Sequence, residues 1–398
     1  MKILLGGVPF GCDNIGDEAI LASVISIFRR LVPDAEITVL TRAISETSKK
    51  FNLPCVPLFG FHLGPPLEEF EHEVKKYDFY VWAGATGLSD YPKLACKLLE
   101  IAQKNSVKTI VWNVGMNSSL NPAFFKIGRC KSAICSVVSR ILPIDLKKTW
   151  EDYRERKMRK HIGAVLNKCD LVVLRDIQSW NEVKKCNPEV NAFVGADSAI
   201  LQQSVDVLNW SEEDKQKFYS KPKRIALCIS AQTPVRQMTE FVSFIDHESK
   251  KNPDILWVMV PMNPISDYKL LKSMQEKAAC KENILLTRFI EPEEIQTLVG
   301  ECHFTISSRL HLIILSLNKA IPAIGIGRGS KVNNFLSYFH LPLCGTTDSI
   351  DFDAMAKNIE KYLNDNTFSA FAQEKQKEML SSLSEAEKKL TALLLSSK

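Results

Sequence analysis

Three side chains suited to ligand chemistry follow two predicted strands in the second half of the chain. Arg309 and His311 come after the strand-like run 303–306, and Lys331 follows a short apolar run that ends at Ile326. Because parallel strands end at one edge of a sheet, we expect these side chains to meet where open α/β sheets bind ligands. Two fixed cations beside an imidazole suit a small, highly anionic substrate that must also be protonated.

Each of these residues also has a plainer interpretation. A single histidine among apolar residues is usually a packed core residue, but a position two residues from Arg309 favours a functional role for His311. The loop from Gly325 to Lys331 resembles a phosphate-binding turn because it follows a strand and ends in a lysine. A surface turn with a solvated lysine is the alternative.

The loop after the first strand holds a second group of candidates, namely Asn14, Gly16, Asp17 and Glu18. It precedes a helix, and the N–H groups at a helix N-terminus attract anions. The loop does not match GxGxxG or GxxxxGK[ST], which disfavours a standard NAD or P-loop site. Asn14 and Asp17 serve either function or helix capping. Asp17 or Glu18 is also a candidate base.

Arg175 stands at the end of another predicted strand and is followed by Asp176. A functional arginine and a structural ion pair are both compatible with this pattern.

Strands alternate with helices in both halves of the chain. This alternation predicts an α/β protein with two Rossmann-like domains whose parallel sheets face a cleft, a GT-B-like fold. We expect an N-terminal domain over 1–215, a C-terminal domain over 222–365 and an amphipathic helix over 366–398. The strands are predicted at 2–6, 36–41, 79–83, 108–112, 171–174, 192–195, 224–229, 255–260, 284–286 and 303–306.

Length and composition agree with a two-domain soluble protein. The chain has 398 residues, 45% hydrophobic and 24% charged. Its eleven cysteines are scattered without a CxxC pair or zinc-like spacing, which favours reduced thiols in a cytoplasm and no metal. The N-terminus predicts a strand rather than a secretory signal, and no apolar run approaches the roughly 20 residues that span a bilayer.

The basic charge is concentrated in one segment. Residues 126–161 contain eleven lysines and arginines against four acids, around apolar runs at 133–138 and 141–144. A solvated helix joined to a core segment is one interpretation. Peripheral contact with anionic lipid at the inner face of a membrane is the other. No nucleic-acid-binding module accompanies the charge.

Taken together, these motifs resemble the polysaccharide pyruvyl transferase family. The resemblance rests on 14–20, on 173–176 with Ser179, on 195–197, and on Ser308 to His311 with the later run 329–331. It implies a GT-B-like fold and an enzyme that uses phosphoenolpyruvate as co-substrate without a cofactor. The donor is expected at Ser308, Arg309, His311, Gly329, Lys331 and Arg175, and the acceptor or its base at Asn14, Asp17 and Glu18 in the N-terminal domain.

The implied reaction joins the enolpyruvyl unit to two hydroxyls of a sugar, expected to be a lipid-linked or polysaccharide-precursor glycan, forming a pyruvate ketal and releasing phosphate. Arg309 and Lys331 would hold the anionic donor, and His311 would protonate its methylene carbon. Two alternatives remain open: a GT-B glycosyltransferase that uses a nucleotide sugar, and a non-catalytic binding protein of the same fold.

Overall fold

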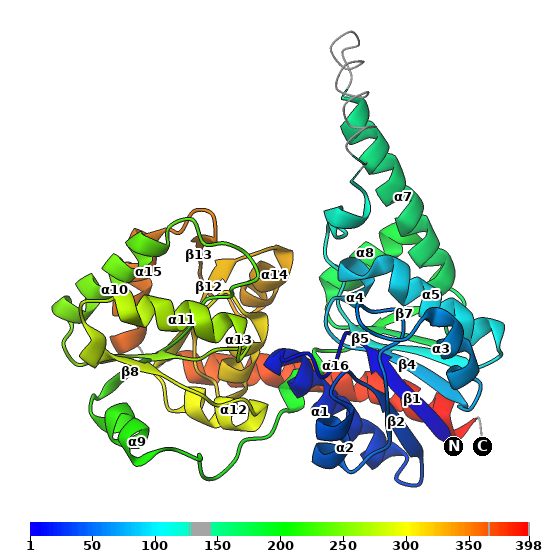
Figure 1. Cartoon of the computed structure of the whole chain (residues 1–398), viewed down its shortest axis with the longest axis horizontal. Helices are drawn as coiled ribbons and strands as arrows, with labels where there is room; N and C mark the ends of the chain where they lie inside the picture. Colours follow the sequence, from blue (N-terminus) through cyan, green and yellow to red (C-terminus); the bar gives the residue numbers. More distant parts are fainter. Residues whose placement is uncertain (127, 129–144, 365–366, 397–398) are drawn as a thin grey trace. The chain divides into compact units, whose positions relative to one another are not determined.

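The computed structural model describes residues 1–126, 128, 145–364 and 367–396. The chain folds into two compact units, each built on one sheet with helices around it (Figure 1). The first unit comprises Met1–Phe10, Ile27–Asp197 and Ser382–Lys398, and the second comprises Gly11–Ser26 and Ser198–Ser381.

All seven strands of the first unit's sheet are parallel, in the order β3-β2-β1-β4-β5-β6-β7. Most are continuous apolar runs, as expected for strands covered on both faces by helices. The strands are β1 (Lys2–Gly7), β2 (Glu36–Leu40), β3 (Cys55–Val56), β4 (Phe79–Ala83), β5 (Lys108–Val114), β6 (Leu171–Leu174) and β7 (Ala192–Val194). The helices wholly in this unit are α2 (Ile44–Phe51), α3 (Leu67–Val74), α4 (Gly87–Asp90), α5 (Pro92–Lys104), α7 (Leu146–Leu166) and α8 (Ile177–Cys186).

The second unit's sheet has six parallel strands in the order β10-β9-β8-β11-β12-β13. These are β8 (Lys223–Cys228), β9 (Ile255–Met259), β10 (Ile284–Leu286), β11 (Phe304–Ser307), β12 (Ala323–Gly327) and β13 (Leu343–Thr346). Its helices are α9 (Glu212–Tyr219), α10 (Met238–Lys251), α11 (Ser266–Lys277), α12 (Pro292–Gly300), α13 (Leu310–Asn318), α14 (Ser330–Tyr338) and α15 (Phe352–Asn364). The predicted fold class, α/β with two parallel sheets, is confirmed.

The strand order of the second sheet reverses between β8 and β11. The chain leaves β8 toward β9 and β10, then returns to pair β11 with the other side of β8, with Ser307 opposite Cys228. Such a reversal leaves a crevice outside the carboxyl ends of the strands, where ligands of open α/β sheets bind. The topology therefore points to the residues that follow β8 and β11.

The two units are not the continuous ranges 1–215 and 222–365 that the sequence predicts. Residues 198–221 belong to the second unit because Leu208 and Phe218 are buried in its hydrophobic core. Ile15, at the start of α1 (Ile15–Leu31), lies in the same core. Helix α1 and helix α16 (Phe368–Leu395) each begin in the second unit and end in the first.

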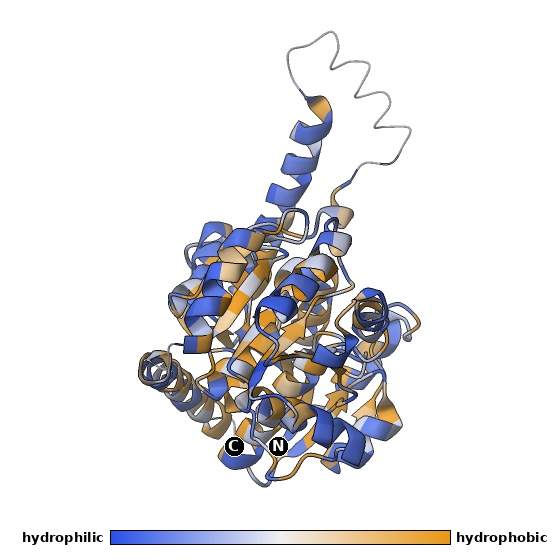
Figure 2. Ribbon diagram, turned by 90° about the vertical axis from the view of Figure 1, so that its left-hand side faces the viewer, coloured by the Kyte–Doolittle hydropathy of each residue, from blue (hydrophilic) through white to orange (hydrophobic). Residues whose placement is uncertain are grey.

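The predicted basic and apolar segment is described in part. Its apolar runs at 133–138 and 141–144 lie outside the described residues, whereas residues 145–161 form the cap and most of α7. Hydropathy colouring shows apolar strands inside the units and a largely polar α7 (Figure 2). Within the described ranges, no helix is both long enough and apolar enough to span a membrane.

Candidate active site

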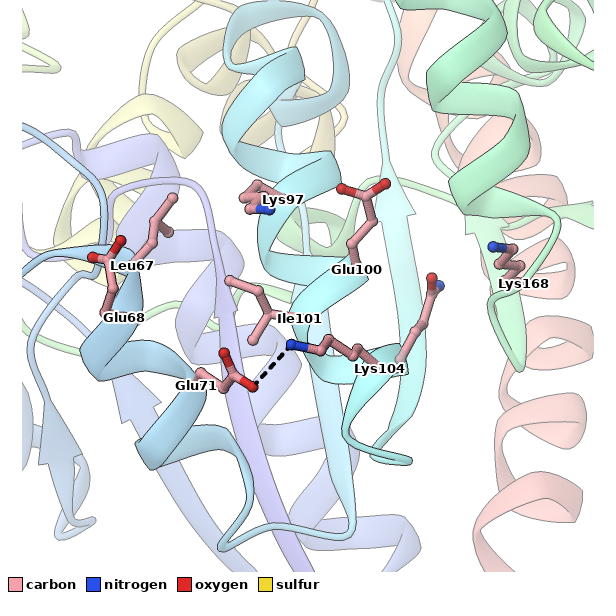
Figure 3. A pocket seen from close by; sticks show the side chains of 9 residues that line it. Leu67, Glu68, Glu71, Lys97, Glu100, Ile101, Lys104 and Lys168 are labelled. Carbon is pink, nitrogen blue, oxygen red and sulfur yellow. Dashed lines mark hydrogen bonds and ion pairs between the residues drawn. The ribbon is translucent and has the colours of Figure 1, made fainter.

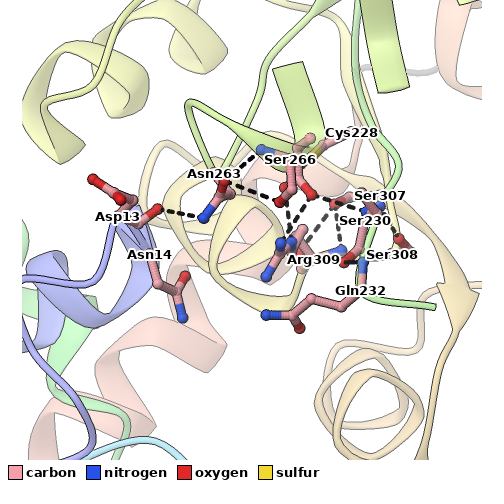
Figure 4. Close-up of polar contacts among 12 residues, drawn as sticks. Asp13, Asn14, Cys228, Ser230, Gln232, Asn263, Ser266, Ser307, Ser308 and Arg309 are labelled. Atoms are coloured by element: carbon pink, nitrogen blue, oxygen red, sulfur yellow. Dashed lines mark hydrogen bonds and ion pairs between the residues drawn. The ribbon is translucent and has the colours of Figure 1, made fainter. Parts of the chain in front are cut away.

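The loop after β11 is held against the end of β8 by a set of serine hydroxyls. The Ser308 hydroxyl accepts a hydrogen bond from the backbone N–H of Ser230 at 2.8 Å, which bridges the two strands where their order reverses. The Ser307 hydroxyl accepts from the N–H of Arg309 at 2.9 Å and donates to its carbonyl at 3.0 Å. These bonds fix Arg309 as the residue that precedes α13 (Figure 4).

Arg309 forms a buried ion pair that the sequence does not predict. Its Nε and Nη2 both lie 2.9 Å from the carboxylate of Asp267 on α11. The side chain of Asp267 is 0% exposed, and one of its oxygens also accepts from the N–H of Ala231 at 2.9 Å. Asp267 therefore occupies the Nε–Nη2 edge of the Arg309 guanidinium, and this pair does not use the N–H groups of Nη1 or the second N–H of Nη2.

The N-terminal loop lies with these residues in the second unit. The N–H of Ile15 donates to the carbonyl of Met262 at 3.2 Å, and the Asn263 amide donates to the carbonyl of Asp13 at 2.9 Å. Both contacts join the loop to the segment between β9 and α11, and Figure 4 shows Asn263 reaching toward Asp13. The predicted acceptor residues thus belong to the same unit as Arg309, His311 and Lys331 and not to the first unit.

Asp17 is the buried carboxylate of this group, with 7% of its surface exposed. Burial raises its pKa, although His311, a hydrogen bond from Asn14, Lys331 and Arg309 all act in the opposite direction. The Asn14 amide donates to the Asp17 carboxylate at 2.6 Å. Asp17 is consequently surrounded by the three groups that the sequence selects for donor chemistry.

His311 lies in the first turn of α13 and packs directly against the start of α1. A Cβ atom added to Gly16 would lie 2.0 Å from its Nδ1, so only glycine allows this approach. Glu18 has a different position, because its carboxylate accepts from the N–H of Gly11 at 2.8 Å and braces the loop. Of the two candidate bases, the contacts therefore favour Asp17.

Lys331 and Gly329 lie at the N-terminus of α14, directly after β12. Arg328 belongs to the same loop, although the sequence does not predict it as a site residue, and it reaches back to the end of β8. Its Nη1 donates to the Ser230 hydroxyl at 2.8 Å and its Nη2 to the Gln232 side chain at 2.8 Å. An arginine next to the carboxyl end of a parallel strand is the signal that could have identified it.

Arg175 belongs to the first unit, whereas the other donor candidates belong to the second. Its guanidinium, 6% exposed, lies 3.1 Å from Asp176 and 3.5 Å from Asp197. Burial acts to lower the pKa of Arg175, but the two carboxylates outweigh it and raise that pKa. These contacts match the structural ion pair that the sequence left as an alternative.

The first unit also has a surface hollow of about 630 Å³ between α3 and α5 (Figure 3). Charges of both signs line it, including Glu71, Lys97 and Glu100, and Glu71 pairs with Lys104 at 3.4 Å. None of the predicted site residues lines it. Elsewhere in the described part of the chain, no group of three or more His, Cys, Asp or Glu side chains is placed to hold a metal ion.

Solved structures define the fold class. A putative UDP-N-acetylglucosamine 2-epimerase from Listeria monocytogenes matches with a TM-score of 0.63 and 12% identity, over 99% of this chain and 95% of that one. MnaA of S. aureus, solved with UDP, matches at 0.60 and 11%, over 97% and 91%. HepE of Anabaena, in complex with UDP, matches at 0.60 and 12%, over the whole of both chains. The fold is therefore GT-B-like.

The sequence itself identifies the family within this class. Residues 14–330 match the model of the polysaccharide pyruvyl transferases, and the chain belongs to that family. The match begins at Asn14 and ends at Ser330, so it spans both the N-terminal loop and the loop that precedes α14.

Proposed function

We propose that this chain transfers the enolpyruvyl unit of phosphoenolpyruvate to two hydroxyls of a sugar, forming a cyclic pyruvate ketal and releasing phosphate. Membership of the family supports a pyruvyl transferase. The observation that carries the proposal is the meeting of one buried carboxylate, Asp17, with His311, Lys331 and Arg309 in a single unit. Together they supply an acid, a base and two cations.

Donor binding is assigned to the cations at the ends of β11 and β12. Phosphoenolpyruvate carries a carboxylate and a phosphate, which match the charges of Arg309, Lys331 and the additional Arg328. Helices α13 and α14 begin at the same strand ends without side-chain caps, so their N-terminal N–H groups add partial positive charge. A donor contact for Arg175 rests on the sequence prediction alone, and we do not include it in this assignment.

The proton transfers are assigned to His311 and Asp17. His311 donates a proton to the methylene carbon of phosphoenolpyruvate, which makes C2 electrophilic. One sugar hydroxyl attacks C2 while Asp17 accepts its proton, and the C2–phosphate bond then breaks as the cations hold the departing phosphate. The second hydroxyl then attacks C2 and closes the ketal, and its proton passes to His311, which gave up its own in the first step. A raised pKa suits Asp17 to this role because an ionised carboxylate of higher pKa is a stronger base.

The proposal is tested by measuring phosphate release from phosphoenolpyruvate with a panel of free and lipid-linked sugars. His311→Ala should retain phosphoenolpyruvate binding and lose turnover by about 10²–10⁴-fold. Lys331→Ala should weaken donor binding by roughly 10- to 150-fold, the effect of about 1.5–3 kcal/mol. Lys269→Ala, an exposed lysine on α11, is the matched control and should leave both unchanged. A fully active His311→Ala enzyme would refute the general-acid role.

A nucleotide-sugar glycosyltransferase is the second candidate, because solved structures with this fold contain UDP. Thermal shifts separate the two. Phosphoenolpyruvate at a hundred times its Kd should stabilise the protein by about 2.7 kcal/mol, whereas UDP and UDP-sugars should not. Stabilisation by UDP alone would favour the glycosyltransferase, and stabilisation by neither would favour a non-catalytic binding protein. A cytoplasmic location and a lipid-linked acceptor stay predictions.

A further inference from the structure

Helix α7 extends away from the sheet of the first unit (Figures 1 and 2). Its buried residues begin only at Met158 and continue at Ile162, Gly163, Val165 and Leu166. The preceding residues, 146–157, form an arm of about 18 Å at 1.5 Å per residue. Arg154 holds the base of this arm through bonds to the carbonyls of Phe125 and Lys126 at 3.2 and 3.3 Å. The arm thus presents an outer surface of its own to its surroundings.

The outer face of α7 carries a stripe of aromatic and basic side chains. Positions 146, 150, 153, 157 and 160 are spaced three or four residues apart and therefore fall on one side of the helix. Trp150 and Tyr153 are 52% and 55% exposed, with ring centroids 6.3 Å apart. Lys157, Lys160 and the adjacent Arg156 are also exposed. We name Leu146, Trp150, Tyr153, Arg156, Lys157 and Lys160 the α7 stripe.

Most acids of α7 lie away from the stripe. Glu155 faces the body of the first unit, where it pairs with Arg159 at 3.0 Å. Glu151 falls outside the three- and four-residue spacing that defines the stripe, whereas the exposed Asp152 lies four residues before Arg156, at the edge of the stripe. A helix with charges of both signs mixed on one face would suit ordinary solvation. Here Trp150 and Tyr153 share one side of the helix with Lys157 and Lys160, and Asp152 is the acid at its edge. Aromatic and basic side chains gathered on one side are the pattern of a surface that meets anions and an apolar boundary together.

We propose that the α7 stripe binds the surface of an anionic phospholipid membrane. Arginine and lysine there would contact lipid head groups, while Trp150 and Tyr153 would sit at the interface, where amphipathic rings are enriched. A single exposed helix can lie flat on such a surface. A single helix does not form the basic groove that follows a nucleic acid strand, so an anionic membrane is favoured over a nucleic acid as the partner.

Vesicle co-sedimentation of the full chain tests this proposal, using phosphatidylcholine with and without phosphatidylglycerol. Binding should require phosphatidylglycerol and weaken in high salt. Each cation near such a surface contributes roughly fivefold to partitioning, so Arg156→Glu/Lys157→Glu/Lys160→Glu should lower it by about 100-fold or more. Trp150→Ala/Tyr153→Ala should also weaken binding. The control Lys49→Glu/Lys50→Glu/Lys97→Glu makes the same change in net charge at exposed positions of the same unit and should retain binding.

Three outcomes would overturn the proposal: no binding to anionic vesicles, equal loss in the stripe and control variants, or binding to nucleic acid in place of vesicles. Stripe variants should keep the wild-type Tm because the altered side chains are exposed. They should also keep phosphate release with a free sugar. A failure here is therefore distinct from a failure of pyruvyl transfer.

Discussion

Replacement of Asp267 with alanine is the sharpest test of how the donor site is built. The wild-type carboxylate receives Nε and Nη2 of Arg309 and the N–H of Ala231, each at 2.9 Å. The two charged side chains are 8% and 0% exposed. Asp267→Ala would leave the guanidinium buried without its counter-charge and the N–H without its acceptor.

The structure sets the size of the expected loss. Removing one partner of a buried ion pair costs about 3–5 kcal/mol, because the remaining charge is uncompensated. A unit of 150–250 residues loses about 2–4 °C in Tm per kcal/mol, so the second unit should melt roughly 6–20 °C lower. Asp267→Asn keeps the shape but turns an amide toward the guanidinium, and its loss should be smaller. Both variants should raise KM for phosphoenolpyruvate, because Arg309 is no longer oriented.

Calorimetry and phosphate-release kinetics measure these effects. Glu276→Ala is the control, since Glu276 is a 64%-exposed acid on the same helix, 3.9 Å from Lys272. A surface substitution of this kind should stay within about 0.5 kcal/mol of wild type. If Asp267→Ala also stayed within that range with an unchanged KM, Asp267 would not position Arg309.

Three further predictions follow from neighbouring contacts. Gly16→Ala should destabilise the protein by about 1–3 kcal/mol and abolish turnover, since the added Cβ displaces His311, as activity and melting assays will register. Asp17→Asn should raise Tm by an amount that grows as the pH rises from the ordinary carboxyl pKa of 3.8 toward the raised pKa of Asp17 and is constant above it. The folded state binds that proton more tightly than the unfolded state, so ionisation destabilises it as pH rises, and melting across a pH series tests the sign. Arg175→Ala should cost about 3–5 kcal/mol by urea unfolding, because Asp197, 1% exposed, loses its ion pair with the guanidinium.

Short apolar runs in the sequence predict most strands of the fold. The strands at 79–83, 171–174 and 284–286 have the predicted bounds, because each is a short buried run between polar segments. The same runs predict that Arg309 and Lys331 follow strands that end at one edge of a parallel sheet, and β11 and β12 are neighbours in the structure. Short strands such as β3, with two half-buried residues, lack this signal.

Contacts between distant parts of the sequence could not be predicted this way. Asp267 lies 42 positions from Arg309 on the polar start of α11, where an acid looks like an ordinary helix-terminal residue. The bond from Asn263 to Asp13 joins residues 250 positions apart. Periodicity shows which face of an element is buried, not which core receives it. For that reason the N-terminal loop was assigned to the wrong unit.

The division of α1 and α16 between the units has a consequence for synthesis on the ribosome. Domains usually fold in order as the chain emerges, with the N-terminal one first. Here the first unit needs the end of α16, where Leu390 and Leu394 are buried and Glu387 pairs with Arg30 at 2.7 Å. The second unit needs Ile15, which emerges long before the strands that enclose it. Neither unit can be completed until almost the whole chain has been translated, so a nascent chain remains dependent on protection from aggregation throughout elongation.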